Sequence, residues 1–363
     1  MISKVRSVTA QDALQQADLH KAIDGNCPFE LNPLATDAAG KEKPWRRGIL
    51  LTHGLSDSPY IMRHLADVFQ ENGFRVMAVL LPGHGTRPGD LLDVTWQEWA
   101  KAVAYGTDKL AAEVDEVYLG GYSAGGALSI YQSLQDQRVR GLFLFAPAIG
   151  ITHRAAFARL HKLVSWLVPC MKWVDIKPDN DIYKYESFAK NTATQMYQLT
   201  LALGAELKQR VLNIPIFTVA SMDDKTVNTV STLEFMAQHE NASNKLILYS
   251  KDTTQFSNNV SGGNIEWVNS FIPEQKILGS AHTAILVSPD DEHYGVHGNY
   301  ANCIHYYRDN MEKYVACTMH PSECWLGEIL EKNLEIGVLR RLMYNPNFAA
   351  LKKSLKLFID NLP

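Results

Sequence analysis

The stretch Gly121-Tyr122-Ser123-Ala124-Gly125 decides how this sequence is interpreted. It ends an apolar run, residues 117–122, that is typical of a buried strand, and it opens a segment with helical periodicity. Flanking glycines suit a strand-to-helix turn that is too crowded for Cβ atoms and that projects a serine hydroxyl outward. We therefore predict that Ser123 is a nucleophile at a helix N-terminus, where backbone N–H groups favour developing negative charge.

Strand-like and helix-like segments alternate on both sides of this turn. Predicted strands cover residues 47–53, 74–81, 117–122, 139–146, 214–220 and 245–249. Predicted helices cover residues 60–72, 95–112, 124–134 and a last segment that Asn345 caps and Pro346 opens. Short apolar strands alternating with helices imply an α/β protein with a mostly parallel, doubly wound sheet and right-handed crossovers.

One long segment interrupts this alternation. Residues 148–213 carry no strand pattern, and an apolar stripe in their first part predicts a helix. The members of this stripe are Phe157, Leu160, Val164 and Leu167. We predict a core of residues 1–147 and 214–363 with a helical cap, or lid, inserted at 148–213.

Two backbone N–H groups are candidates for stabilising the oxyanion of an acyl-transfer reaction. In a site of this type, one comes from the residue after the nucleophile and the other from the loop after an earlier strand. This rule assigns Ala124 and Leu55, the latter in the turn His53-Gly54-Leu55. Both residues would act through the main chain, so their side chains contribute little to charge stabilisation. His53 is expected to be structural.

The acid of a serine–acid–histidine triad is expected directly after the predicted strand at 214–220. Asp223 and Asp224 are adjacent there, and both are candidates. Asp224 is favoured because it precedes Val227 by three residues, and this valine can return to the core. The acid would orient the imidazole and stabilise its positive charge without taking its proton.

The base is expected after the last predicted strand. His282 follows the apolar pair Ile277-Leu278 and lies among small residues, which suits a histidine that projects into a cleft. His297, in a glycine-flanked turn, is the main alternative. Further rivals are His293, His305 and His320, whereas His239 comes too early in the chain. Triads whose serine lies on such a strand-to-helix turn follow the chain order serine, acid, histidine, and Ser123, Asp224 and His282 have this order.

Composition restricts the remaining possibilities. The 363 residues are 46% hydrophobic and 20% charged, with a formal net charge of −4, which indicates a globular chain without a basic surface for nucleic acid. No apolar stretch approaches the roughly 18 residues of a membrane span. We therefore expect no nucleic-acid partner and no stable membrane insertion, in a soluble cytoplasmic protein.

Cysteine and histidine spacing predicts neither a disulfide scaffold nor a metal site. The five cysteines are odd in number and form no Cys-x-x-Cys pair, so we expect mostly buried thiols in a reducing compartment. Cys317 and Cys324 are close enough in sequence to suggest one local bridge. The cluster of His293, His297, Cys303 and His305 matches no common zinc spacing, and we expect no metal there.

Three motifs carry a resemblance to a known family. They are Leu50-Leu51-Thr52-His53-Gly54-Leu55-Ser56, Leu81-Pro82-Gly83-His84-Gly85 and Gly121-Tyr122-Ser123-Ala124-Gly125. Together they resemble the bacterial carboxylesterase and monoacylglycerol lipase group, within the wider serine aminopeptidase-like hydrolases. The similarity is clear over about residues 46–147, thinner over 214–249, and returns at His282. It implies the α/β-hydrolase fold with a helical cap after the strand that follows the serine.

The resemblance also implies an activity. Members of this group hydrolyse carboxylic esters through an acyl-enzyme and without a cofactor, so we expect a small-molecule ester substrate with an apolar acyl chain. Acyl transfer to another acceptor, peptide hydrolysis by the same triad, and a non-catalytic binding role on this fold remain alternatives. Residues 251–275 and 286–340 depart from the family pattern as irregular insertions, and they bear on the choice of substrate.

Overall fold

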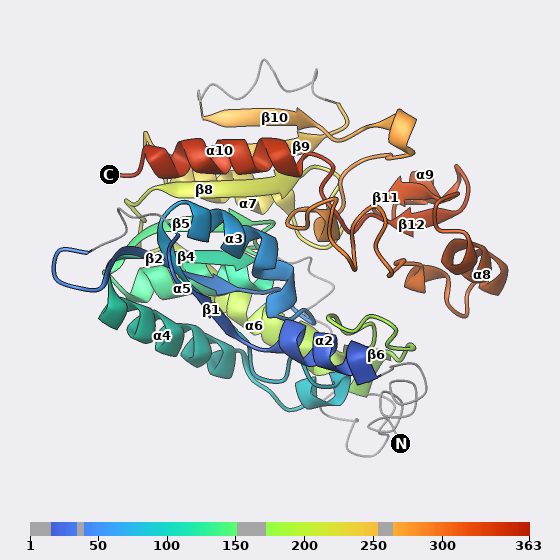
Figure 1. The fold of residues 1–363 in the computed structure, drawn as a ribbon, viewed down its shortest axis with the longest axis horizontal. Helices are drawn as coiled ribbons and strands as arrows, with labels where there is room; N and C mark the ends of the chain where they lie inside the picture. The colour runs from blue at the N-terminus through green and yellow to red at the C-terminus, as the bar shows by residue number, and fades with distance from the viewer. Residues whose placement is uncertain (1–15, 35–39, 151–171, 253–263) are drawn as a thin grey trace. The chain divides into compact units, whose positions relative to one another are not determined.

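The computed structural model describes residues 16–34, 40–150, 172–252 and 264–363 (Figure 1). The chain forms two compact units. The first comprises Met1–Phe143 and Pro147–Ile214, and the second comprises Leu144–Ala146 and Pro215–Pro363. Each unit contains parallel strands accompanied by helices, so the predicted α/β class is confirmed.

The first unit is built on strands in the order β1-β3-β2-β4-β5. Their bounds are β1 Phe29–Leu31, β2 Trp45–Thr52, β3 Phe74–Val79, β4 Val114–Tyr122 and β5 Val139–Phe145, whose end belongs to the second unit. β2 pairs in parallel with both β3 and β4, whereas β1 pairs antiparallel with β3. The second half of β2 and most of β4 are buried, which explains why both strands appear in the sequence as continuous apolar runs.

Helices accompany these strands in the first unit. They are α2 Gln16–Asn26, α3 Arg63–Glu71, α4 Trp96–Glu113, α5 Ala124–Gln135 and α6 Lys190–Leu207. α4 starts at a capping box, in which the Thr95 hydroxyl accepts from the Glu98 N–H and the Glu98 carboxylate accepts from the Thr95 N–H. α6 packs against α4 and α5, so the described end of the predicted cap is joined to the helix that follows Ser123.

The predicted cap contains strands that the sequence does not predict. β6 Trp173–Asp175 and β7 Phe188–Ala189 form a short antiparallel pair. Elements of this length are too short to show the alternation by which a strand is recognised. The apolar stripe from Phe157 to Leu167 lies outside the described residues.

The second unit has parallel strands β8 Ile216–Ser221, β9 Lys245–Ser250 and β10 Ile265–Asn269. The Ala146 N–H donates to the Val219 carbonyl oxygen at 2.7 Å, which joins the chain end of β5 to β8. Helix α7 spans Thr229–Gln238, and α10, Phe348–Asp360, lies alongside β8 (Figure 1). The rings of Phe217 and Phe358 pack there with centroids 5.3 Å apart.

β10 corrects the expectation that residues 251–275 form only a loop. All its residues are half-buried or exposed. Glu266 forms an ion pair with Lys245 at 2.9 Å and accepts a hydrogen bond from Ser354 on α10. A strand of this kind shows no apolar run, so the sequence pattern does not reveal it.

Residues 286–340 are likewise more regular than predicted. They contain α8 Met311–Met319, α9 Glu331–Leu334 and the parallel pair β11 Trp325–Gly327 and β12 Leu339–Arg341, which ends just past this segment. Each element is short, so its hydrophobic periodicity is too brief to predict it from the sequence.

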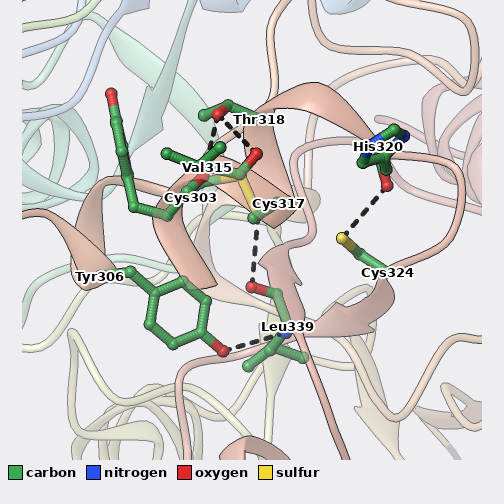
Figure 2. The surroundings of a disulfide bond; sticks show 9 residues. Cys303, Tyr306, Val315, Cys317, Thr318, His320, Cys324 and Leu339 are labelled. Carbon is green, nitrogen blue, oxygen red and sulfur yellow. Dashed lines mark hydrogen bonds between the residues drawn. A yellow bond between two sulfur atoms is a disulfide. The ribbon is translucent and has the colours of Figure 1, made fainter. Parts of the chain in front are cut away.

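A disulfide lies in the same segment (Figure 2). It joins Cys303 to Cys317, so the expectation that the cysteines are mostly buried thiols is wrong for these two residues. The local bridge that the spacing of Cys317 and Cys324 suggested is not formed, because Cys317 pairs with Cys303. Cys324 is a buried free thiol whose Sγ donates to the His320 carbonyl oxygen at 3.5 Å. Connectivity depends on how the chain folds, and spacing alone does not determine it.

The final helix begins later than predicted. α10 starts at Phe348, and the Asn345 side chain accepts from the Asn347 N–H at 2.9 Å in the turn before it. Its amide also donates to the Tyr249 hydroxyl and to the Ile285 carbonyl oxygen. Across the described ranges, no helix combines the length and apolar character needed to cross a bilayer.

Candidate active site

Ser123 occupies a strained turn between β4 and α5. Its backbone has φ 53° and ψ −113°, a conformation that few residues other than glycine adopt. A Cβ atom on Gly121 would lie 2.2 Å from the Gly125 carbonyl oxygen, and one on Gly125 would lie 2.0 Å from the Thr52 carbonyl oxygen. The glycines are therefore required by close packing of the backbone, as expected for a turn that presents a nucleophilic serine.

The turn after β2 lies beside the Ser123 turn. Thr52 at the end of β2 pairs with Gly121 in β4, so the chain from His53 to Leu55 continues next to the start of α5. Ala124 is buried as the first residue of α5, and Leu55 is half-buried. The fold thus brings both predicted oxyanion residues to the edge where Ser123 lies.

His53 is held as a neutral structural side chain. Its Nε2 accepts a hydrogen bond from the Leu81 N–H at 3.0 Å, so its Nδ1 carries the proton and donates to the Gly54 carbonyl oxygen at 2.8 Å. Complete burial lowers the pKa of His53 to about 4, and His84 beside it has a pKa lowered by burial to about 3. The two rings pack together and join the turn at residues 53–55 to the turn at residues 81–85. Neither ring is suited to proton transfer near neutral pH.

An ion pair between the buried Asp57 and the half-buried Lys184 connects the loop after β2 to the predicted cap. Lys184 Nζ lies 2.5 Å from Asp57 Oδ1 and donates to the Leu55 carbonyl oxygen at 3.4 Å. The next residue, Tyr185, donates its N–H to the Ser56 carbonyl oxygen at 2.9 Å and its hydroxyl to the Gly83 carbonyl oxygen at 3.2 Å. Sequence reasoning missed this anchor, because no local pattern links residues so far apart in the chain.

Asp224 and His282 meet in the second unit. Asp224 Oδ2 lies 2.6 Å from His282 Nδ1. Asp224 Oδ1 accepts from the Thr226 N–H at 2.7 Å and the Val227 N–H at 2.9 Å. Burial works against ionisation of Asp224, but His282 and these N–H groups outweigh it and hold its pKa below the usual range. An ionised acid can only accept, so His282 Nδ1 carries the proton and Nε2 is left as the basic nitrogen.

Asp223 has a different environment from its neighbour. Its carboxylate lies 3.6 Å from Lys251 Nζ and 3.5 Å from the Ser270 hydroxyl. Burial raises the pKa of Asp223, and Lys251 only partly offsets this effect. Of the two candidate acids, Asp224 is the one placed against the His282 ring.

The rival histidines have other surroundings. His297 and His320 are exposed, and His239 Nδ1 lies 2.8 Å from the Phe235 carbonyl oxygen within α7. His293 Nδ1 lies 2.6 Å from Asn299 Oδ1, and its ring stacks on Tyr300. Cys303 is in the disulfide, and no group of three metal-ligating side chains is found in the part of the chain that the structure describes.

One contact of His282 was not predicted from the sequence. Its backbone N–H donates at 3.0 Å to the carboxylate of Glu328, which follows β11. Glu328 in turn forms an ion pair with Arg341. The predicted site residues therefore fall into two groups: Ser123, Leu55 and Ala124 in the first unit, and the Asp224–His282 pair in the second.

Comparison with known proteins identifies the class. The family described as serine aminopeptidase, S33, matches residues 43–252, which is more than half of the chain. The chain belongs to this family and is an α/β hydrolase, as the three sequence motifs predict.

Two relatives define the similarity further. The thermostable monoacylglycerol lipase of Bacillus sp. (strain H-257) is 31% identical over 109 residues, which are 30% of this chain and 44% of that protein. The match therefore spans less than half the length of this curated relative. A solved structure from work on LipS and LipT, two metagenome-derived lipolytic enzymes, has a TM-score of 0.51 and 20% identity, covering 62% of this chain and 88% of that one. This likeness shows the fold.

Proposed function

We propose that this protein hydrolyses carboxylic esters through an acyl-enzyme on Ser123. The observation that carries the proposal is the strained Ser123 turn, in which close-packed glycines hold a serine at the N-terminus of α5. Such strain is retained where it serves function. The Asp224–His282 pair supports the proposal, because a carboxylate that holds Nδ1 orients the imidazole and makes Nε2 its basic nitrogen.

The proposed reaction is a two-step acyl transfer. His282 Nε2 takes the Ser123 proton as the hydroxyl oxygen attacks the ester carbonyl, and the N–H groups of Leu55 and Ala124 stabilise the oxyanion. The alcohol leaves with a proton from His282, and the acyl group remains on Ser123. Water, activated by the same imidazole, then releases the acid and restores the serine. Asp224 orients His282 and stabilises its positive charge, and no cofactor or metal takes part.

An ester with an apolar acyl chain is the substrate class that we propose. The Bacillus relative is a monoacylglycerol lipase, and the LipS and LipT enzymes are lipolytic. Peptide hydrolysis is the second candidate, because the matched family is described as serine aminopeptidase. Esters of p-nitrophenol with graded acyl length, assayed beside aminoacyl p-nitroanilides, separate the two.

We also propose that residues 148–213 act as a cap over the Ser123 edge of the first unit. The described part of this segment is fastened to the loop after β2 by Lys184 and Tyr185, so it lies next to the proposed oxyanion residues. An anchored cap of this kind can limit access of water and of large substrates to the serine.

The test of the proposed function is covalent labelling. A fluorophosphonate probe is expected to modify Ser123, and Ser123→Ala is expected to lose both labelling and ester hydrolysis. Ser133→Ala is the matched control, because the hydroxyl of this buried serine donates to the Ile130 carbonyl oxygen within α5 and its loss should leave labelling unchanged. Label on another serine, or ester hydrolysis that survives Ser123→Ala, would overturn the proposal.

A further inference from the structure

Glu328 is a buried carboxylate that the proposed reaction does not use. It is 1% exposed and follows β11, within residues 286–340. Burial works against its ionisation, but Arg341 and two backbone N–H groups outweigh this effect and hold the pKa of Glu328 below its usual range. A buried charge is costly unless it is paired and hydrogen-bonded, so each of its contacts is informative.

The contacts of Glu328 lead to the proposed base. Its Oε2 accepts from the His282 N–H and from Arg341 Nη2, both at 3.0 Å. Its Oε1 accepts from the Ile329 N–H at 2.9 Å and lies 2.9 Å from Arg341 Nε. Glu328 thus holds the main chain of His282 at the start of the 3₁₀ turn His282–Ala284, while Asp224 holds its ring.

Arg341 extends the same contacts to the acid. Its Nη2 also donates to Thr226 Oγ1 at 3.0 Å, and the Thr226 N–H donates to Asp224 Oδ1 at 2.7 Å. The ion pair between the buried Glu328 and the half-buried Arg341 therefore contacts both the loop that carries Asp224 and the loop that carries His282. A shift of this pair would change how the two loops lie relative to each other.

Short strands hold the ion pair in place. β11 and β12 pair in parallel, and Gly327 lies opposite Arg341, so Glu328 and Arg341 emerge at the same end. β11 also bridges to the segment before His282: the Leu278 N–H donates to the Leu326 carbonyl oxygen, and the Leu326 N–H donates to the Lys276 carbonyl oxygen, both at 2.8 Å. The Thr283 hydroxyl bonds the Leu342 carbonyl oxygen at 2.7 Å.

We infer that Glu328 and Arg341 are positioning residues for the Asp224–His282 pair, and that residues 286–340 act as a support for the base. This inference rests on the proposed function, because it assigns the support to the reaction that His282 serves. The geometry of a site depends on supporting residues that hold the reacting side chains in position. A displacement of a reacting group by about 1 Å can cost roughly 100-fold in rate.

The test uses four variants of the full chain. Arg341→Met leaves the buried Glu328 carboxylate unpaired, and Glu328→Met leaves the half-buried Arg341 guanidinium unpaired, so both should be destabilised, Arg341→Met the more. Glu328→Met/Arg341→Met leaves no unpaired charge but gives the His282 N–H no acceptor, so it should regain stability. Its kcat for a p-nitrophenyl ester should nevertheless stay about 10- to 100-fold below that of the parent, with KM changed little. Glu328→Gln keeps one oxygen acceptor for the His282 N–H, so its kcat should lie between that of the parent and that of the double variant.

Arg75→Met is the matched control. Arg75 is a buried arginine on β3 that is ion-paired with Glu113 and Glu30, so its loss should lower stability while kcat is retained. A parent-like kcat in the folded double variant, or an equal loss of kcat in Arg75→Met, would overturn the inference.

A second readout keeps the inference separate from the proposed function. The proton on His282 Nδ1, shared with Asp224, should give a far-downfield NMR resonance that Asp224→Asn removes. This resonance should shift or broaden in Glu328→Met/Arg341→Met and stay unchanged in Arg75→Met. An unchanged resonance in the double variant contradicts the positioning role. If Ser123→Ala keeps its hydrolysis while the resonance responds as expected, the proposed function fails and the structural support stands.

Discussion

Asp224 is a carboxylate with partners on both oxygens, and the adjacent Asp223 has none of these contacts. One Asp224 oxygen holds the His282 ring, and the other accepts two backbone N–H groups. We expect Asp224→Asn to lower kcat for ester hydrolysis by about 10⁴-fold, because an amide favours the wrong imidazole tautomer. Asp223→Asn is the control and should cost far less. A loss at Asp223 equal to that at Asp224 would contradict this assignment.

The same pair of residues predicts a pH dependence of stability. A carboxyl whose pKa is lower in the folded chain adds stability above its unfolded pKa, and this stability is lost as pH falls through the folded value. Asp224 follows this sign, whereas the raised pKa of Asp223 has the opposite sign and costs stability at neutral pH.

Denaturation in urea at two pH values checks these signs. Asp224→Asn should lower the free energy of unfolding at pH 7 and lower it less near pH 3. Asp223→Asn should not lower it at pH 7. An equal loss for Asp224→Asn at both pH values would show that the contacts of the ionised Asp224 carboxylate do not contribute to stability as described.

At the scale of elements, the disulfide Cys303–Cys317 braces the segment that carries α8. Cys317 Sγ lies 3.6 Å from the Leu339 carbonyl oxygen in β12, and the Leu339 N–H donates to the Tyr306 hydroxyl at 3.0 Å (Figure 2). The Arg341 N–H donates to the carbonyl oxygen of Asn302, next to Cys303, at 3.0 Å. The covalent link therefore lies directly against β12.

Removal of this link should lower stability. The two cysteines are 14 residues apart, and closing a loop of this size stabilises by about 3 kcal/mol in the chain-entropy description. We expect Cys303→Ser/Cys317→Ser to lower the Tm clearly under non-reducing conditions, measured by calorimetry. Cys324→Ser removes a buried sulfur without breaking a covalent bond and is the control. Equal Tm values for the two variants would contradict a structural role for the disulfide.

At the scale of the whole molecule, local stability should differ along the first unit. β4 is buried and paired with β2, whereas the pair β6–β7 has only two short strands. We expect backbone amides in residues 173–189 to exchange with deuterium faster than those in β4, because short strands open more readily than core strands. Protection equal to that of β4 would show that this part of the proposed cap is as stable as the core.

The sequence predicts the parts of the molecule whose signal is local. Buried parallel strands give apolar runs, so β2, β3 and β4 were located within a few residues, and the Ser123 turn follows from its glycines. Asp224 and His282 were chosen from chain order and neighbouring residues, and the structure places the two side chains in contact.

Features that depend on distant pairing were not predicted. The Lys184–Asp57 pair, the Glu328–Arg341 pair and the Cys303–Cys317 link each join residues whose local sequence gives no reason for the contact. β10 was missed for another reason, since a half-exposed strand lacks an apolar run. Their positions follow from tertiary packing, which a periodicity argument does not contain.

The bridge between β11 and the segment before His282 has a consequence for anyone who redesigns this chain. Residues 286–340 depart from the family pattern as an insertion, so a minimal scaffold or a chimera based on that pattern would omit them. Such a deletion keeps the serine pentapeptide, the acid and the histidine, yet it removes the acceptor of the His282 N–H and both hydrogen bonds that Leu326 makes with the main chain at Lys276 and Leu278. A shortened version should therefore be built with a replacement strand and carboxylate at this place.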